Sequence, residues 1–166
     1  MDIQKHKLNT SFNYLVILSV LIVLGVVGRL LPHPPNFTPM AAIALFAGFI
    51  FLKRYIAVIA VVVTMLLTDY FAFGYLSAEW FASKSMWVVY LALLFPIVFK
   101  NFLQKKLGLF RVAGAALASS TVFFIATNFA VWAFSPMYEK TLEGLVLCYT
   151  MAIPFFQNTV AGDLIW

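Results

Sequence analysis

The sequence predicts an all-α integral membrane protein, built as a bundle of six transmembrane helices with both termini on the cytoplasmic side. Hydrophobic residues make up 64% of the chain and charged residues only 10%. The mean hydropathy is +0.98. A chain of 166 residues cannot hide that much apolar surface in a water-soluble core, so a lipid bilayer is the expected solvent.

The apolar runs give the number of spans, since a helix needs about 20 residues to cross a hydrocarbon core of roughly 30 Å. Six runs form one transmembrane domain over residues 1–166, and they are expected at about 12–31, 39–52, 55–71, 86–99, 112–134 and 142–164. The first run ends in Arg29 and prolines rather than in a small-residue cleavage site. It is therefore expected to be a retained helix and not a signal peptide.

The basic residues test this topology. With a cytoplasmic N-terminus, the inner side collects Lys5, Lys7, Lys53, Arg54, Lys100, Lys105, Lys106 and Arg111, and the outer side keeps Arg29, Lys84 and Lys140. This excess on the inner side follows the positive-inside rule. The alternative is one long helix over residues 40–71, giving five spans. That helix would place Lys53 and Arg54 near the membrane centre, at about 2.5–3.5 kcal/mol each, so six spans are favoured.

Residues 29–39 are the segment least suited to lipid. They hold four of the chain's seven prolines, together with Arg29, His33 and Asn36. Proline lacks a backbone donor and pushes the preceding residue out of the helical region. Two interpretations stay open: a stiff turn between two spans, or a lid over a ligand pocket. We expect residues 32–39 to be ordered and to pack over the outer ends of the fifth and sixth spans.

Polar side chains within the spans are the candidate functional residues. Asp69, at the outer end of the third span, is either an outer-surface cap or a partner for Arg29, or else part of a pocket wall. Asn128 belongs to a polar and aromatic stripe on the fifth span and either joins helices or contacts a ligand. The candidate ligand-binding residues that converge on the outer side are Arg29, His33, Asn36, Asp69, Asn128, Trp132, Tyr138 and Glu143.

Small residues one helical turn apart let another helix approach closely. Ala44 and Gly48 have this spacing on the second span, and we expect them to dock a partner protein. Gly114 and Ala118 repeat the spacing on the fifth span, where contacts inside the bundle are expected.

Several function classes are excluded. The sequence offers no nucleophile and base at workable spacing, no metal-ligand spacing and a single cysteine, Cys148, so we expect neither an enzyme nor a metal site nor a cofactor. It has no glycine-rich phosphate loop, and no acid deep in a span suggests a proton relay. The short basic clusters fit topology signals and not nucleic-acid binding.

Four segments carry a resemblance to a known family: residues 29–48 (RLLPHPPNFTPMAAIALFAG), 123–132 (FFIATNFAVW), 138–144 (YEKTLEG) and 148–156 (CYTMAIPFF). They resemble the signature of uncharacterised bacterial six-helix membrane proteins. That family is similar to the substrate-binding S components of energy-coupling-factor (ECF) vitamin transporters. The resemblance implies an S-component-like fold in the bacterial inner membrane. It also implies an ECF-type transmembrane coupling subunit and ATPases as partners.

Among S components, the cobalamin type is nearest. It shares a proline-bearing first loop, a second span like Ala44–Gly48 and a pair like Asp69-Tyr70. Residues 72–85 contain no cysteine, however, so cobalt ligation by a thiolate is not expected. The expected function is capture of a small molecule, such as a vitamin, in an outward-facing pocket. The alternative is a non-transport scaffold that binds another membrane protein.

Overall fold

The computed structural model of the chain describes residues 10–73 and 78–166, and the regular structure in these residues is helical throughout. The N-terminal cations Lys5 and Lys7, on which part of the predicted topology rests, lie outside the described residues. The elements are α1 (Thr10–Leu30), α2 (Met40–Ile50), α3 (Arg54–Phe73), α4 (Ala78–Ala82), α5 (Lys84–Leu94), the 3₁₀ helix η2 (Phe95–Phe99), α6 (Lys100–Lys105), α7 (Leu109–Phe134) and α8 (Leu142–Ile165).

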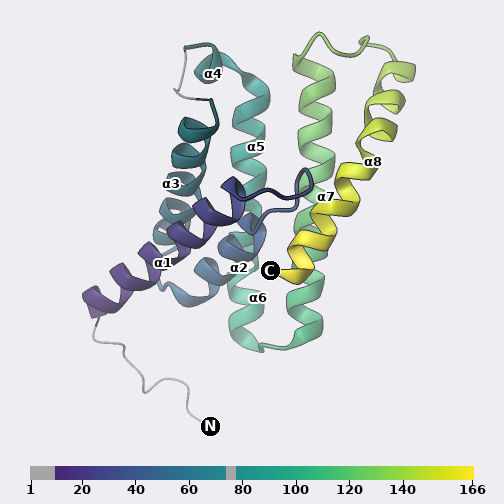
Figure 1. The fold of residues 1–166 in the computed structure, drawn as a ribbon. Helices are drawn as coiled ribbons and strands as arrows, with labels where there is room; N and C mark the ends of the chain where they lie inside the picture. Colours follow the sequence, from purple (N-terminus) through teal and green to yellow (C-terminus); the bar gives the residue numbers. More distant parts are fainter. Residues whose placement is uncertain (1–9, 74–77) are drawn as a thin grey trace.

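Five stretches of the described chain are long and apolar enough to cross a membrane: Asn13–Leu30, Arg54–Ala72, Lys84–Lys105, Leu109–Phe134 and Leu142–Ile165. They make the chain a multi-pass, all-helical membrane protein. The third of them joins α5, η2 and α6, because Pro96 in the first turn of η2 has no intrahelical donor to lose. Figure 1 shows α3, α5, α7 and α8 side by side, with α1 lying obliquely across α3.

The run at 39–52 was predicted to span the membrane, but its helix is too short to do so. It forms α2, whose 11 residues reach only about 16 Å at 1.5 Å per residue. A hydrocarbon core of roughly 30 Å is nearly twice as thick. α2 contacts α1, α3, α5, η2, α6, α7 and α8, so it lies at the centre of the bundle and does not cross the membrane alone.

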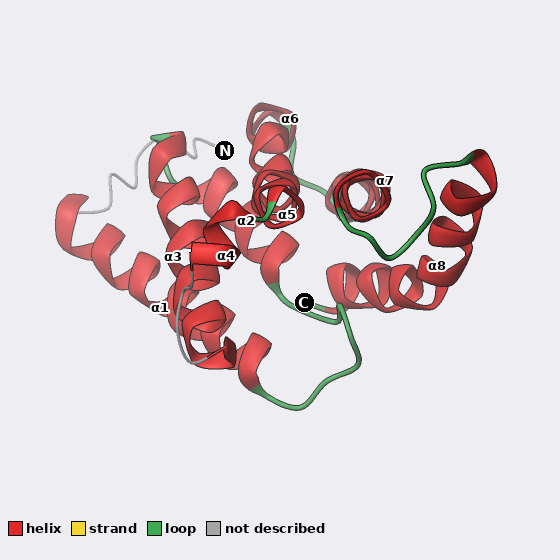
Figure 2. Cartoon of the chain, turned by 90° about the horizontal axis from the view of Figure 1, so that it is seen from above, coloured by secondary structure: helices red, strands yellow, loops and turns green. Residues whose placement is uncertain are grey.

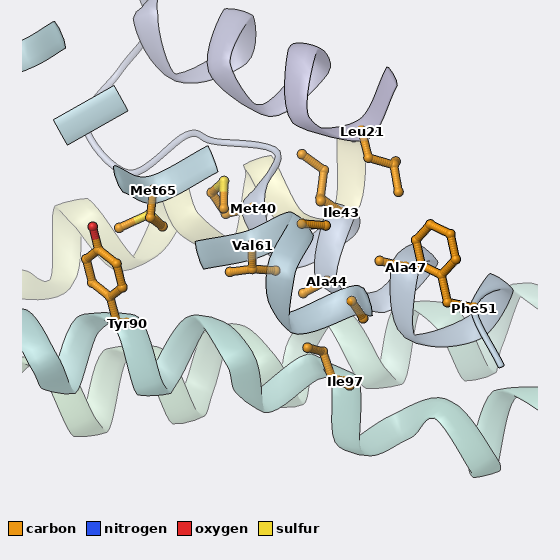
Figure 3. Packing of buried hydrophobic residues seen from close by; sticks show 12 residues of the cluster. Leu21, Met40, Ile43, Ala44, Ala47, Phe51, Val61, Met65, Tyr90 and Ile97 are labelled. Atoms are coloured by element: carbon orange, nitrogen blue, oxygen red, sulfur yellow. The ribbon is translucent and has the colours of Figure 1, made fainter. Parts of the chain in front are cut away.

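The main hydrophobic core forms around α2 (Figure 3). Ala44, Ala47 and Phe51 are fully buried, and Val61 of α3 and Ile97 of η2 pack against the same cluster. A helix that is apolar on all sides is expected to be surrounded by other helices. The sequence of α2, MAAIALFAGFI, fits this position.

The basic stretch after residue 99 is helical and not a loop, because Lys100 is buried within the bundle. Its Nζ donates to the backbone oxygens of Phe51 and Leu52, at 2.8 Å for Phe51. Gln104 Nε2 donates to the oxygen of Phe49 at 2.8 Å. The two side chains thus satisfy carbonyls at the end of α2 that have no partner within the helix.

The proline-rich loop, residues 31–39, is ordered, but it packs on a different surface from the one predicted. Phe37 and Thr38 lie against Gly162, where a Cβ would stand 3.2 Å from the Cα of Phe37. The Phe37 and Trp166 rings are 6.4 Å apart. The loop therefore meets the last turns of α8, on which Gly162 lies, and not the residues 134–142 where α7 and α8 join. In Figure 1 it reaches from α1 toward the middle of α7.

α8 bends in its course, which is visible in Figure 2. Pro154 lies inside the helix, where it removes a backbone hydrogen bond to Thr150. The bend carries the last turns of α8 toward the proline-rich loop. α7 packs against both α5 and α8 and so forms the wall between the two halves of the bundle.

Candidate functional site

A buried ion pair joins three helices. Arg29 of α1 contacts Asp69 of α3, with 3.1 Å between Nη2 and Oδ1, and Tyr90 of α5 donates its hydroxyl to Asp69 Oδ2 at 2.8 Å. Arg29 Nη1 also contacts Met65 Sδ. Asp69 is only 2% exposed. Of the interpretations left open for Asp69, the structure shows the partner for Arg29, inside the protein rather than at its surface.

Two adjacent cavities lie between this ion pair, the proline-rich loop, α7 and α8. We name them the small chamber, of about 120 Å³, and the large chamber, of about 260 Å³. The residues that line both chambers are Asn36, Val89, Phe123 and Thr159. Arg29, Thr38, Met65 and Asp163 contribute to the small chamber only. Sharing four wall residues makes the chambers neighbouring parts of one site.

Three polar residues of the large chamber donate hydrogen bonds within their own helices. Thr127 Oγ1 donates to Phe123 O at 2.7 Å, and Asn128 Nδ2 donates to Phe124 O at 2.8 Å. On α8, Thr159 Oγ1 donates to Phe155 O at 2.9 Å. Oxygen lone pairs of these side chains are therefore left to accept hydrogen bonds. The remaining wall is mostly aromatic: Phe123, Phe124, Phe155 and Phe156.

A carboxylate also lines the small chamber. Asp163 of α8 accepts a hydrogen bond of 2.6 Å from Ser120 Oγ, and Ser120 is fully buried near the middle of α7. Asp163 also borders an apolar cavity of about 380 Å³ between α2, α6 and the end of α8. Among the described residues, the ion pair is Arg29–Asp69, and Asp163 has no cationic partner.

Three of the predicted binding residues meet at this site. Arg29 and Asn36 line the small chamber, and Asn36 and Asn128 line the large one. Asn36 reaches both because it has a positive φ of 66°, a left-handed conformation that asparagine tolerates better than most residues. Asp69 supports the site from behind through Arg29.

The other four predicted residues do not line either chamber. His33 folds back on its own loop, with Nδ1 2.8 Å from Pro34 O and Nε2 3.1 Å from Arg29 O. Trp132 donates Nε1 to Glu139 O at 2.9 Å, in the connection between α7 and α8 that also holds Tyr138. Glu143 is exposed in the first turn of α8, where an acid suits the helix dipole.

The structure places the predicted docking pair, Ala44 and Gly48, inside the bundle. Ala44 is fully buried, and a Cβ on Gly48 would stand 3.3 Å from the Cα of Ile97 in η2. The close approach that small residues permit is thus made by the chain itself. Gly114 was expected to make contacts inside the bundle, but a Cβ there would meet nothing within 4 Å.

Sequence reasoning missed Tyr90, Ser120, Thr159 and Asp163 as parts of the site. Asp163 had a usable signal, because it is an acid inside the apolar run 142–164. An ionisable residue in a span is a functional hypothesis by default. Among the described residues, no group of three or more His, Cys, Asp or Glu side chains could hold a metal ion.

Comparison with known proteins gives one match. The sequence model of a family of unknown function, DUF6580, matches residues 9–166. No curated protein matches the chain, and no solved structure matches it. Because the match covers nearly the whole sequence, the chain belongs to the DUF6580 family.

Proposed function

We propose that the chain is a substrate-binding subunit of a membrane uptake system, which captures a small molecule in the two chambers. The observation that carries the proposal is the composition of their walls. Two phenylalanine-rich turns, one on α7 and one on α8, enclose a few polar groups from α7, α8 and the proline-rich loop. Small-molecule sites have this character, with apolar and aromatic walls and a small number of polar groups that fix orientation.

The size of the site limits the ligand. The chambers measure about 120 and 260 Å³. Only taken together do they reach the lower end of the ~300–1,000 Å³ typical of small-molecule pockets. A ligand of the size of a single ring system suits them, and a corrinoid does not. This agrees with the lack of a cysteine in residues 72–85.

The resemblance to S components of ECF transporters supports the same role. In that arrangement the chain binds the substrate, and a transmembrane coupling subunit with its ATPases supplies the energy. The proposal places the six helical segments α1, α2, α3, α5–α6, α7 and α8 in alternating directions. In it, the short α2 returns the chain to the inner side, so that both termini lie inside. It also places the chain in the bacterial inner membrane.

The test is ligand-dependent stabilisation of the purified chain in lipid nanodiscs. A panel of water-soluble vitamins and metabolites is screened by thermal unfolding, since a ligand that binds only the folded state raises its Tm. Ala152 is buried in the wall of the large chamber, so Ala152→Leu should fill the chamber and abolish the rise. Thr150 is exposed on the same helix, and Thr150→Leu is the matched control.

Under the proposal, at least one compound raises the Tm of the unmodified chain and of Thr150→Leu, but not of Ala152→Leu. An equal rise in Ala152→Leu would place the binding elsewhere. No rise with any compound would contradict substrate capture and favour the scaffold alternative.

A further inference from the structure

We infer that the chambers bind a small organic cation, an aromatic compound that carries a protonated amine. This inference rests on the proposed function and names the chemical class of its substrate. It places the ammonium group at Asp163 in the small chamber and the ring among the phenylalanines of the large chamber. Three independent features of the walls lead to it: the hydrogen-bonding character, the charge and the aromatic surface.

The chambers hold several oxygens that can accept hydrogen bonds. The hydroxyl hydrogens of Thr127 and Thr159 and one of the two Asn128 Nδ2 hydrogens are donated to backbone oxygens one turn earlier. These side chains therefore offer a ligand two hydroxyl oxygens and an amide oxygen, beside the remaining N–H of Asn128. A ligand rich in acceptors would leave those oxygens unpaired, at a cost for each buried group. A ligand with several N–H groups would satisfy them.

The charge in the small chamber is negative. The charged residues that line it are Arg29 and Asp163, and Asp69, behind the lining, pairs with Arg29, so that the charge of Asp163 is left without a counter-ion. The guanidinium of Arg29 is already engaged by Asp69 and Met65. Asp163 receives one hydrogen bond, from Ser120, on Oδ2. A carboxylate in surroundings of low dielectric attracts a cation far more strongly than it would in water.

The acceptors are arranged along one line. Thr159 and Asp163 are four residues apart on α8 and so lie on the same face of the helix, and both line the small chamber. Thr159 also lines the large chamber. A protonated amine at Asp163 can therefore donate to the Thr159 hydroxyl as well, and the rest of the molecule extends past Thr159 toward Asn128.

The large chamber supplies the surface for a ring. Phe124 and Phe156, from α7 and α8, have centroids 4.7 Å apart and an interplanar angle of 38°. Phe123 and Phe155 line the same chamber. Aromatic faces favour ring contacts, and they also attract a nearby cation through their quadrupoles. An anion gains nothing from these faces and is repelled by Asp163.

The experiment compares three probes of nearly the same shape on the full chain in nanodiscs. These are 2-phenylethylamine, which is a cation at neutral pH, 2-phenylethanol, which is neutral, and phenylacetate, which is an anion. Their Kd values are measured by titration calorimetry, and sodium and potassium chloride serve as inorganic cation arms. The inference predicts that 2-phenylethylamine binds at least tenfold more tightly than either of the other probes.

Variants locate the cation. Asp163→Asn keeps the shape of the side chain and should weaken binding of 2-phenylethylamine by about 10- to 100-fold, the loss expected for one hydrogen bond to a charged group. Glu143→Gln removes an exposed acid from the same helix and should change nothing. The comparison of the three probes on the unmodified chain does not depend on the folding of any variant.

The outcomes separate this inference from the proposed function. Equal affinity for the amine and the alcohol, or an unchanged Kd in Asp163→Asn, overturns the organic cation and leaves small-molecule binding intact. So does a neutral or anionic metabolite that binds in the chambers when the amine does not, or stabilisation by sodium or potassium alone. Failure of every small molecule to bind overturns both.

Discussion

Gly162 lies against the backbone of Phe37, so that a loop from the first third of the chain closes on the last turns of α8. This contact places Asn36 in the walls of both chambers. The residue adjacent to Phe37 can line them only because position 162 has no side chain. The loop is therefore a structural part of the site rather than a simple connection.

A side chain at position 162 should displace the loop. Gly162→Leu would insert a bulky group where even a Cβ stands 3.2 Å from Phe37 Cα. We expect a destabilisation of about 1–3 kcal/mol, as for other overpacked sites, together with loss of ligand binding. Gly114→Leu is the control, because a Cβ there meets nothing within 4 Å. Unfolding in nanodiscs measures both variants, and equal stability would contradict the packing described.

The ion pair between Arg29 and Asp69 should contribute to stability as a unit. Asp69→Asn leaves Arg29 without its counter-ion and weakens the bond from Tyr90, so we expect a loss of about 3 kcal/mol, as when a buried pair is broken. Arg29→Gln combined with Asp69→Asn should lose less than the sum of the single changes. Additive losses in this double-mutant cycle would show that the two residues act independently.

Gly48 should be intolerant of a side chain for reasons inside the protein. A Cβ there stands 3.3 Å from Ile97 Cα, which belongs to a backbone that cannot move easily. We expect Gly48→Leu to cost about 1–3 kcal/mol through overpacking, and the loss should appear in the purified chain with no partner present. If the purified variant were as stable as the unmodified chain and only assembly with another protein failed, the result would support Gly48 as part of a docking face.

Asn128 should matter for binding more than for folding. Asn128→Leu keeps the bulk of the side chain and removes its amide oxygen from the large chamber. We expect a loss in affinity of about 1–3 kcal/mol, the cost of an unmatched buried polar group. Thr121→Leu, at an exposed position on the same helix, should leave affinity unchanged. A change in Tm without a change in Kd would assign Asn128 to helix packing.

The proposed topology places the two ends of α7 on opposite sides of the membrane. Leu107 and Met137 are exposed at those ends, 60% and 70% respectively, and Cys148 is buried. Met137→Cys should react with a membrane-impermeant maleimide in intact cells, and Leu107→Cys only after permeabilisation. Labelling of both cysteines from the same side of the membrane would contradict the proposed topology.

Much of the fold follows from apolar runs, because four of the six runs become single long helices near the predicted boundaries. The fate of the run at 39–52 could not be predicted in the same way. In a membrane protein, residues facing lipid and residues facing other helices are equally apolar, so the sequence of α2 does not distinguish a short span from a buried centre. The shortness of the run at 39–52, against the roughly 20 residues that a span needs, was the one usable sign.

The site was predictable in part. Asn36 and Asn128 are large polar groups in apolar surroundings and were recognised on that basis. Thr159 was not, because a threonine in an apolar helix can satisfy its hydroxyl on its own backbone, as Thr159 does here. The contact between Ser120 and Asp163 spans 43 residues and depends on the bend of α8, which local sequence patterns do not specify.

The most direct test of the central claim is a high-resolution structure of the chain purified from its native membrane in the presence of the best-binding compound. Small-molecule capture in the chambers predicts ordered ligand density beside Asn36 and Asn128, with a nitrogen within hydrogen-bond distance of Asp163. Chambers filled by lipid chains, with the compound bound elsewhere or not at all, would contradict the account.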